Sequence, residues 1–146
     1  MPLTIVVADD DPQYREIVRH LLAVAADTVT IVGEAGDGEA ALALVRRERP
    51  DIVLTDLVMP LLNGIELTRR IRQELPLTKV ILMSSYTEDA YRHMVSDSGA
   101  DVFVSKQVIM TSLLPAMRDL VRRWLSGGSG RVPPITGASS SAPLST

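Results

Sequence analysis

The sequence predicts an α/β fold, (βα)5, in which parallel strands and helices alternate in a doubly wound sheet. Short runs of β-branched and other apolar residues recur along the chain, separated by stretches with helical periodicity. Gly or Pro marks most boundaries between the two kinds of segment. The chain has 146 residues, which suits one domain with one core. Alternating strands and helices favour a mostly parallel sheet with helices on both faces.

The expected strands are the short apolar runs. The run at 52–55 is continuously apolar apart from its last residue, so we expect it to be buried on both faces. The five runs lie at 3–8, 29–33, 52–55, 79–84 and 102–105.

The expected helices follow these strands. Pro12 suits the first position of a helix, and Asp11 before it suits the N-cap. Pro50, Pro76 and Gly99 end later helices. The helices are expected at 12–26, 39–49, 65–74, 87–98 and along the amphipathic stretch 113–125; the fourth is polar and the weakest.

The chain changes character after Ser126. Residues 127–146 are rich in Gly, Ser, Pro and Thr and lack apolar periodicity. Such a composition buries too little surface to offset the entropy of ordering. We therefore expect a folded domain at 1–126 and a disordered tail or linker at 127–146.

Composition excludes several classes of protein. The net charge of −3 argues against direct nucleic-acid binding, which normally needs a basic face. There is no cysteine, so disulfides and thiolate metal sites are excluded. No apolar run reaches the ~18 residues of a membrane span, and no basic segment of a signal peptide precedes the first strand. We expect a cytoplasmic protein without a membrane partner.

Acidic residues gather where two strands end. Right-handed crossovers favour the flavodoxin-like strand order 2-1-3-4-5, which places strands one and three side by side. Asp9 and Asp10 follow strand one, and Asp56 follows strand three, so their side chains should converge. Carboxylates that converge repel one another, and such a cluster usually holds a hard cation such as Mg²⁺.

Two further strand ends carry groups that suit phosphoryl chemistry. Strand four ends in Ser84-Ser85, and strand five ends in Ser105-Lys106. A carboxylate can act as a nucleophile and become an aspartyl phosphate. A metal ion and an ammonium neutralise the phosphoryl oxygens, and a hydroxyl can donate to them.

The chain resembles the receiver domains of bacterial two-component response regulators over about residues 3–125. In style it is similar to receivers that carry a helix-turn-helix output domain. The resemblance rests on the order and spacing of several motifs, which are Val7-Ala8-Asp9-Asp10-Asp11-Pro12, Gly33 to Gly38, Pro50 to Pro60, Asn63-Gly64, Met83-Ser84-Ser85 and Gly99-Ala100-Asp101.

The resemblance implies that Asp56 is the phosphoacceptor, charged by a histidine kinase, a phosphotransfer protein or a small phosphodonor. Mg²⁺ or Mn²⁺ would be bound by Asp56, by Asp10 directly, by Asp9 largely through water, and by the backbone carbonyl of Val58. Val58 also stands where a residue could orient an attacking water, and its apolar side chain cannot. We therefore expect slow self-dephosphorylation and no enzymatic turnover of a substrate.

The resemblance also implies a switch. Ser85 and Lys106 would contact the phosphoryl group, and Phe103 would then turn inward. This would alter the surface of helix four, strand five and helix five for a partner or for a homodimer. Residues that suit such a surface are Tyr86, Tyr91, Phe103, Met110, Met117 and Trp124, although Met117 and Trp124 are equally suited to packing helix five on the sheet.

Three other readings compete. A receiver-like module that is never phosphorylated would tolerate losses from the functional set, which is complete here: Asp9, Asp10, Asp56, Ser85 and Lys106. An aspartate-nucleophile phosphatase needs a second Asp two residues after the nucleophile, where this chain has Val58. A flavodoxin needs a phosphate-cradling loop after strand one. The sequence leaves open whether the chain stands alone or was cut before an output domain.

Overall fold

The strands form one parallel sheet in the order β2-β1-β3-β4-β5, as predicted. The structure is a computed structural model that describes residues 2–85, 93 and 96–126. The strands are β1 (Leu3–Ala8), β2 (Val29–Ala35), β3 (Ile52–Asp56), β4 (Lys79–Ser84) and β5 (Val102–Ser105). β3 is buried along its whole length, as its apolar run predicted.

The described helices are α1 (Pro12–Ala23), α2 (Gly38–Glu48), α3 (Gly64–Glu74) and α5 (Ile109–Leu125), with a short 3₁₀ turn, η1 (Lys106–Val108), before α5. Most of the helix expected at 87–98 lies outside the described residues; positions 93 and 96–98 are helical.

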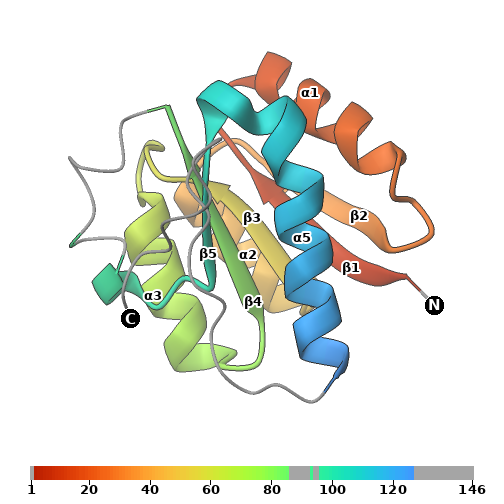
Figure 1. The fold of residues 1–146 in the computed structure, drawn as a ribbon. Coiled ribbons are helices and arrows are strands. Elements are labelled where there is room, and N and C mark those ends of the chain that lie inside the picture. Colours follow the sequence, from red (N-terminus) through yellow and green to blue (C-terminus); the bar gives the residue numbers. More distant parts are fainter. Residues whose placement is uncertain (1, 86–92, 94–95, 127–146) are drawn as a thin grey trace.

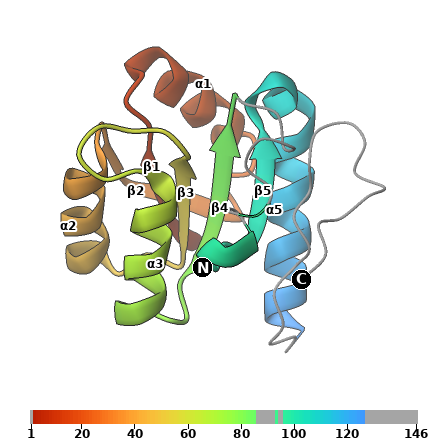
Figure 2. The ribbon, with the colours of Figure 1, turned by 90° about the vertical axis from the view of Figure 1, so that its left-hand side faces the viewer.

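Helices cover both faces of the sheet (Figures 1 and 2). Ile5 and Val7 of β1 face the core that α1 and α5 close. Val6 and Ala8, which alternate with them, face the core that α2 and α3 close. This period of two is the pattern of a strand buried on both sides.

Several helix boundaries differ from the prediction. α1 ends at Ala23 rather than 26, and a turn follows in which the Ala25 backbone N–H donates to the carbonyl of Leu22 at 3.0 Å. Ala25 lies in this turn and is fully buried. As a buried apolar residue it fits the helical spacing in the sequence, although the helix has already ended.

Side-chain caps set the starts of three helices, α1, α2 and α3. Asp11 accepts from the backbone N–H of Gln13 at 2.9 Å, which confirms it as the N-cap of α1. Asp37 and Asn63 do the same for α2 and α3, accepting from Ala40 at 2.7 Å and from Glu66 at 2.9 Å. Both helices therefore begin one position before the expected start.

Candidate functional site

The predicted acidic residues meet at the carboxyl edge of the sheet. Ala8 of β1 pairs with Thr55 of β3, which sets Asp9 beside Asp56. Asp9, Asp10 and Asp56 each offer a carboxylate oxygen, and these atoms lie within 4.8 Å of one another. Asp9 is fully buried and Asp56 is 8% exposed, whereas Asp10 is exposed. The site is therefore open on the side of Asp10.

Asp9 is held from several directions. Its Oδ1 accepts from the Asp11 backbone N–H at 2.9 Å, and its Oδ2 accepts from Lys106 Nζ at 2.6 Å. The Arg15 guanidinium donates to its backbone carbonyl. A buried carboxylate with these partners keeps a fixed orientation.

Asp56 is held less tightly. Its Oδ2 lies 3.1 Å from Lys106 Nζ, and its Oδ1 accepts from the Val58 backbone N–H at a long 3.4 Å. The start of α3 presses against its main chain, because a Cβ built on Gly64 would overlap the Asp56 carbonyl. The Gly64 N–H donates to the Leu57 carbonyl at 2.8 Å and closes the loop after β3. Only a residue without a side chain fits at this point of contact.

Burial shifts the pKa values of Asp56 and Lys106. Burial raises the pKa of Asp56; the positive charge of Lys106 works against this, and the charge of Asp9 adds to it. For Lys106, burial alone would lower the pKa. The hydrogen bond to Asp9 and the charges of Asp56 and Asp9 outweigh it, so the pKa is raised. Lys106 therefore stays protonated between the two carboxylates.

The arrangement fits a divalent metal ion. The carboxylates of Asp9, Asp10 and Asp56 are hard oxygen ligands that share a small space. In the described ion pairs, Lys106 is the cation that contacts Asp9 and Asp56. One ammonium against three carboxylates leaves excess negative charge. A hard cation such as Mg²⁺ would relieve the remaining repulsion.

The remaining predicted site residues lie around this edge. Ser85 directly follows β4 and is exposed, and its carbonyl accepts a long 3.5 Å contact from Gln107 Nε2. Val58 is 47% exposed. Phe103 is 1% exposed and packs in the core under α2 and α3, so it already lies inward.

The surface expected around helix five needs a correction. Met117 is fully buried and Phe103 nearly so, and neither can contribute to an exposed surface. Met110 is 68% exposed, and Trp124 is half-buried against the core. Tyr86 and Tyr91 lie outside the described residues.

Sequence reasoning overlooked Tyr14. Its ring centroid lies 4.1 Å from Lys106 Nζ. In the sequence Tyr14 is one more apolar position of a helix, and nothing in the spacing links it to a lysine far along the chain. Only the packing of α1 beside the end of β5 shows the contact.

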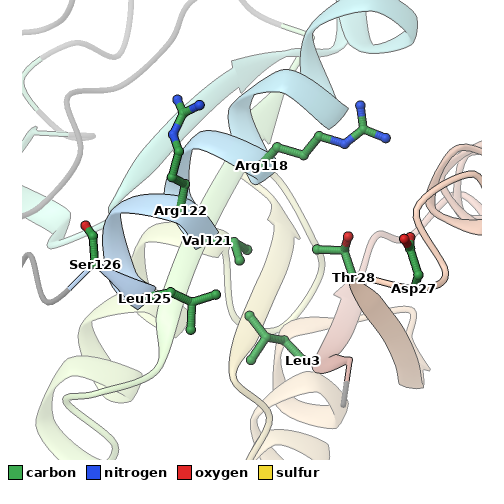
Figure 3. A pocket seen from close by; sticks show the side chains of 8 residues that line it. All are labelled: Leu3, Asp27, Thr28, Arg118, Val121, Arg122, Leu125 and Ser126. Atoms are coloured by element: carbon green, nitrogen blue, oxygen red, sulfur yellow. The ribbon is translucent and has the colours of Figure 1, made fainter.

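A cavity of about 680 Å³ lies elsewhere (Figure 3). Leu3, Val121 and Leu125 contribute apolar side chains to it, and Arg118 and Arg122 lie along α5 beside them. Leu3 opens β1 whereas Asp9 follows its end, so this cavity is separate from the acidic site. Among the described residues, no helix is both long and apolar enough to span a membrane.

Comparison with known proteins identifies the family. The family model of the response regulator receiver domain matches residues 5–118. The transcriptional activator protein ExaE of Pseudomonas putida is 38% identical over 123 residues, which cover 84% of this chain and 55% of ExaE. The transcriptional regulatory protein NarL of Mycobacterium tuberculosis is 37% identical over 131 residues, which cover 85% of this chain and 60% of NarL.

Solved structures agree. The signal receiver domain of NarL from Mycobacterium tuberculosis superposes with a TM-score of 0.76 at 36% identity, covering 83% of this chain and 97% of that domain. A LuxR-family response regulator from Aurantimonas sp. SI85-9A1 gives a TM-score of 0.74 at 30% identity, with 87% of each chain covered. The chain spans between 51% and 60% of the length of the curated relatives that it matches. It belongs to the receiver domains of two-component response regulators.

Proposed function

We propose that Asp56 accepts a phosphoryl group and that Lys106, Asp9 and Asp10 support this transfer. The observation that carries the proposal is the contact of Asp56 Oδ2 with Lys106 Nζ at 3.1 Å, beside two further carboxylates within 4.8 Å. A carboxylate that can act as a nucleophile, a cation and further hard oxygen atoms lie together at one partly open edge, which supports the proposal.

This geometry supports the following route for the transfer. Lys106 holds Oδ2, while Oδ1 has the longer contact, with the Val58 N–H, and is the more available nucleophile. Oδ1 forms the new bond to phosphorus as the bond from phosphorus to the donor breaks, and the donor leaves with that electron pair. With phosphohistidine the leaving group is the imidazole, and with acetyl phosphate it is acetate. Lys106 then donates to a phosphoryl oxygen.

We propose Mg²⁺, or Mn²⁺ in its place, as the ion of this site. Asp10 and Asp56 would bind it directly, Asp9 largely through water, and Val58 through its backbone carbonyl. When bound, such an ion neutralises charge on the phosphoryl oxygens.

The proposed switch starts from Ser85. This hydroxyl is exposed at the end of β4, where it can move toward a phosphoryl group on Asp56. Phe103 already lies inward, so the change would begin at Ser85 rather than with rotation of that ring. The affected surface would comprise helix four, β5 and α5, and would bind a partner or a second copy.

Receiver domains pair with histidine kinases, and we propose such a kinase or a phosphotransfer protein in the cytoplasm as the phosphoryl donor. The net charge of −3 supports protein contacts rather than direct DNA binding by this chain. Val58 is apolar and cannot orient water, which supports slow dephosphorylation and argues against a phosphatase. A half-life of seconds for the phosphorylated protein would contradict slow dephosphorylation.

One experiment tests the acceptor. The protein is incubated with Mg²⁺ and acetyl phosphate, and its intact mass is compared with those of Asp56→Asn and of a control, Asp27→Asn. Asp27 is exposed and lines the separate cavity. We expect one phosphoryl adduct on the wild type and on the control, and none on Asp56→Asn. An adduct on Asp56→Asn would place the acceptor elsewhere.

We further propose that residues 1–126 form the receiver domain and that 127–146 are a tail or linker. The described core is closed by residues up to Val121 of α5. A chain ending at Ser126 should therefore unfold at the same urea concentration as the full chain. A markedly lower midpoint would assign the tail a structural role.

A further inference from the structure

We infer that Tyr14 positions Lys106 for phosphoryl transfer, its ring covering the ammonium and holding it between the carboxylates of Asp9 and Asp56. This inference rests on the role proposed above for Lys106. It adds a residue of α1 to a site that the strand ends supply.

The groups that surround the Lys106 ammonium support this inference. Lys106 Nζ lies 2.6 Å from Asp9 Oδ2 and 3.1 Å from Asp56 Oδ2, while the Tyr14 ring centroid lies 4.1 Å away. An ammonium has three N–H donors, and an aromatic face within about 6 Å attracts the charge. Two carboxylates and one ring thus surround the charge, and the Lys106 side chain is only 10% exposed.

The ring rather than the hydroxyl makes this contact. Tyr14 Oη is buried and is the side-chain atom that lacks a hydrogen-bond partner among the described buried groups. Burial, followed by the charges of Asp9 and Asp56, raises the pKa of Tyr14, so its phenol stays neutral. A Phe at this position would keep the aromatic face and lose only an unpaired hydroxyl.

The contact limits where Lys106 can go. A long lysine side chain normally samples many rotamers, and ordering it costs entropy. With the ring on one side and Asp9 on the other, the ammonium stays next to Asp56. It can then transfer a hydrogen bond to an arriving phosphoryl oxygen without leaving the ring, which is how positioning lowers a barrier.

The kinetic test compares rate constants of phosphorylation by acetyl phosphate with Mg²⁺. Tyr14→Leu should be about threefold to tenfold slower than wild type, the range of a partly buried cation–π contact. Tyr14→Phe should restore the rate to within about twofold, since the ring remains. In a Lys106→Met background, Tyr14→Leu should cause no further loss, because Tyr14 acts through Lys106.

The matched control is Trp124→Leu. Trp124 also lies over a lysine, Lys79, with 5.6 Å between Nζ and the ring centroid. Lys79 opens β4, at the edge opposite to Asp56. This variant should keep the wild-type rate constant of phosphorylation. Such a result would show that losing an aromatic–lysine contact elsewhere in the domain does not slow phosphorylation.

A second measurement does not need phosphorylation. In the absence of metal and phosphodonor, the ε-methylene protons of Lys106 should resonate upfield in NMR spectra of wild type and Tyr14→Phe, because the ring current shields them. The shift should vanish in Tyr14→Leu. Should Tyr14→Leu fail to fold, Tyr14→Met serves in both measurements.

Some outcomes would overturn the inference. One is an ε-methylene resonance of Lys106 that is not shifted upfield in the wild type. A second is a phosphorylation rate constant of Tyr14→Leu equal to that of the wild type. A third is a loss of rate on Tyr14→Leu that is just as large in the Lys106→Met background. If the wild type shows the NMR shift but takes no phosphoryl group, the positioning stands and the proposed phosphoacceptance fails.

Discussion

At the scale of single residues, Asp56 is held where burial opposes its own negative charge. Burial is the main reason why its pKa lies above the ordinary value, and the nearby carboxylate of Asp9 adds to this. Lys106 offsets part of the cost but is shared with Asp9. The folded protein without metal is thus strained electrostatically at the residue that we propose as nucleophile.

A pH prediction follows for Asp56→Asn in buffer with EDTA. The pKa of Asp56 is higher in the folded state than in the unfolded state. Above the ordinary aspartate pKa the folded state therefore holds more protons than the unfolded state, and the stability that Asp56 contributes falls as pH rises. Asp56→Asn should therefore unfold at a higher urea concentration at pH 7. The gain should shrink as pH falls toward the ordinary aspartate value. A variant less stable than wild type at pH 7, with Asp27→Asn unchanged, would contradict the argument.

At the scale of elements, the start of α3 supports the end of β3. Gly64 is where the two main chains touch, and it leaves no space for a side chain against the Asp56 carbonyl. The position of the carboxylate that we propose as phosphoacceptor thus depends on a glycine in another element. This couples the packing of α3 to the geometry of the site.

Gly64→Ala should test that coupling. The added methyl must displace the Asp56 main chain, so we expect a loss of about 1–3 kcal/mol in the free energy of unfolding and slower phosphorylation by acetyl phosphate. Urea unfolding and intact-mass kinetics measure the two effects. The control is Gly36→Ala, where the nearest atom to the new Cβ is the end of the Arg15 side chain at 3.4 Å. Equal effects at both positions would refute the specific role of the α3–β3 contact.

A second pair of elements is joined by Asp101. This carboxylate precedes β5, is 2% exposed, and accepts from the Val80 N–H at 2.8 Å and from Arg72 Nη2 at 2.7 Å. Removing it leaves the buried Val80 N–H without its acceptor and takes one partner from the half-buried Arg72 guanidinium, so Asp101→Ala should cost about 1–3 kcal/mol of unfolding free energy.

Glu74→Ala is the matched control for Asp101→Ala. Glu74 pairs with Arg46 at the same 2.7 Å between α3 and α2, but both side chains are substantially exposed. Loss of this pair should cost about 1 kcal/mol or less. Similar losses at the two sites, measured by urea unfolding, would show that burial does not decide the worth of these ion pairs.

At the scale of the whole molecule, a metal ion that binds only the folded state must stabilise the entire domain. The three aspartates come from two separate segments, so the unfolded chain offers no such cluster. Stability should then rise with the logarithm of metal concentration once binding begins to saturate.

The corresponding prediction is a rise in melting temperature with Mg²⁺ for the wild type and none for Asp10→Asn. Asp10 is exposed, so its substitution removes a proposed ligand without disturbing the core. Differential scanning calorimetry in EDTA and over a Mg²⁺ series measures the effect, and Asp27→Asn should behave like wild type. An identical rise in Asp10→Asn would remove this residue from the metal site.

The sequence determined the elements best where local and global signals agree. The strands at 79–84 and 102–105 were predicted to the residue, because each is a short apolar run between clear breakers. Helix ends were less well predicted, as at α1, where a buried alanine in the turn resembled another helical position. Burial on α5 was also undecided, since Met117 and Trp124 suit either a partner surface or the core until the helix is placed on the sheet.

The sequence by itself determined which chemical groups end each strand, and the strand order then made Asp9, Asp10 and Asp56 neighbours. Only the tertiary structure decided that Lys106 bridges Asp9 and Asp56, that Tyr14 covers it, and that Gly64 touches the main chain of Asp56. The physical reason is the distance along the chain over which each property acts. Strand and helix periodicity are local properties of the chain, whereas these contacts depend on how separate elements pack.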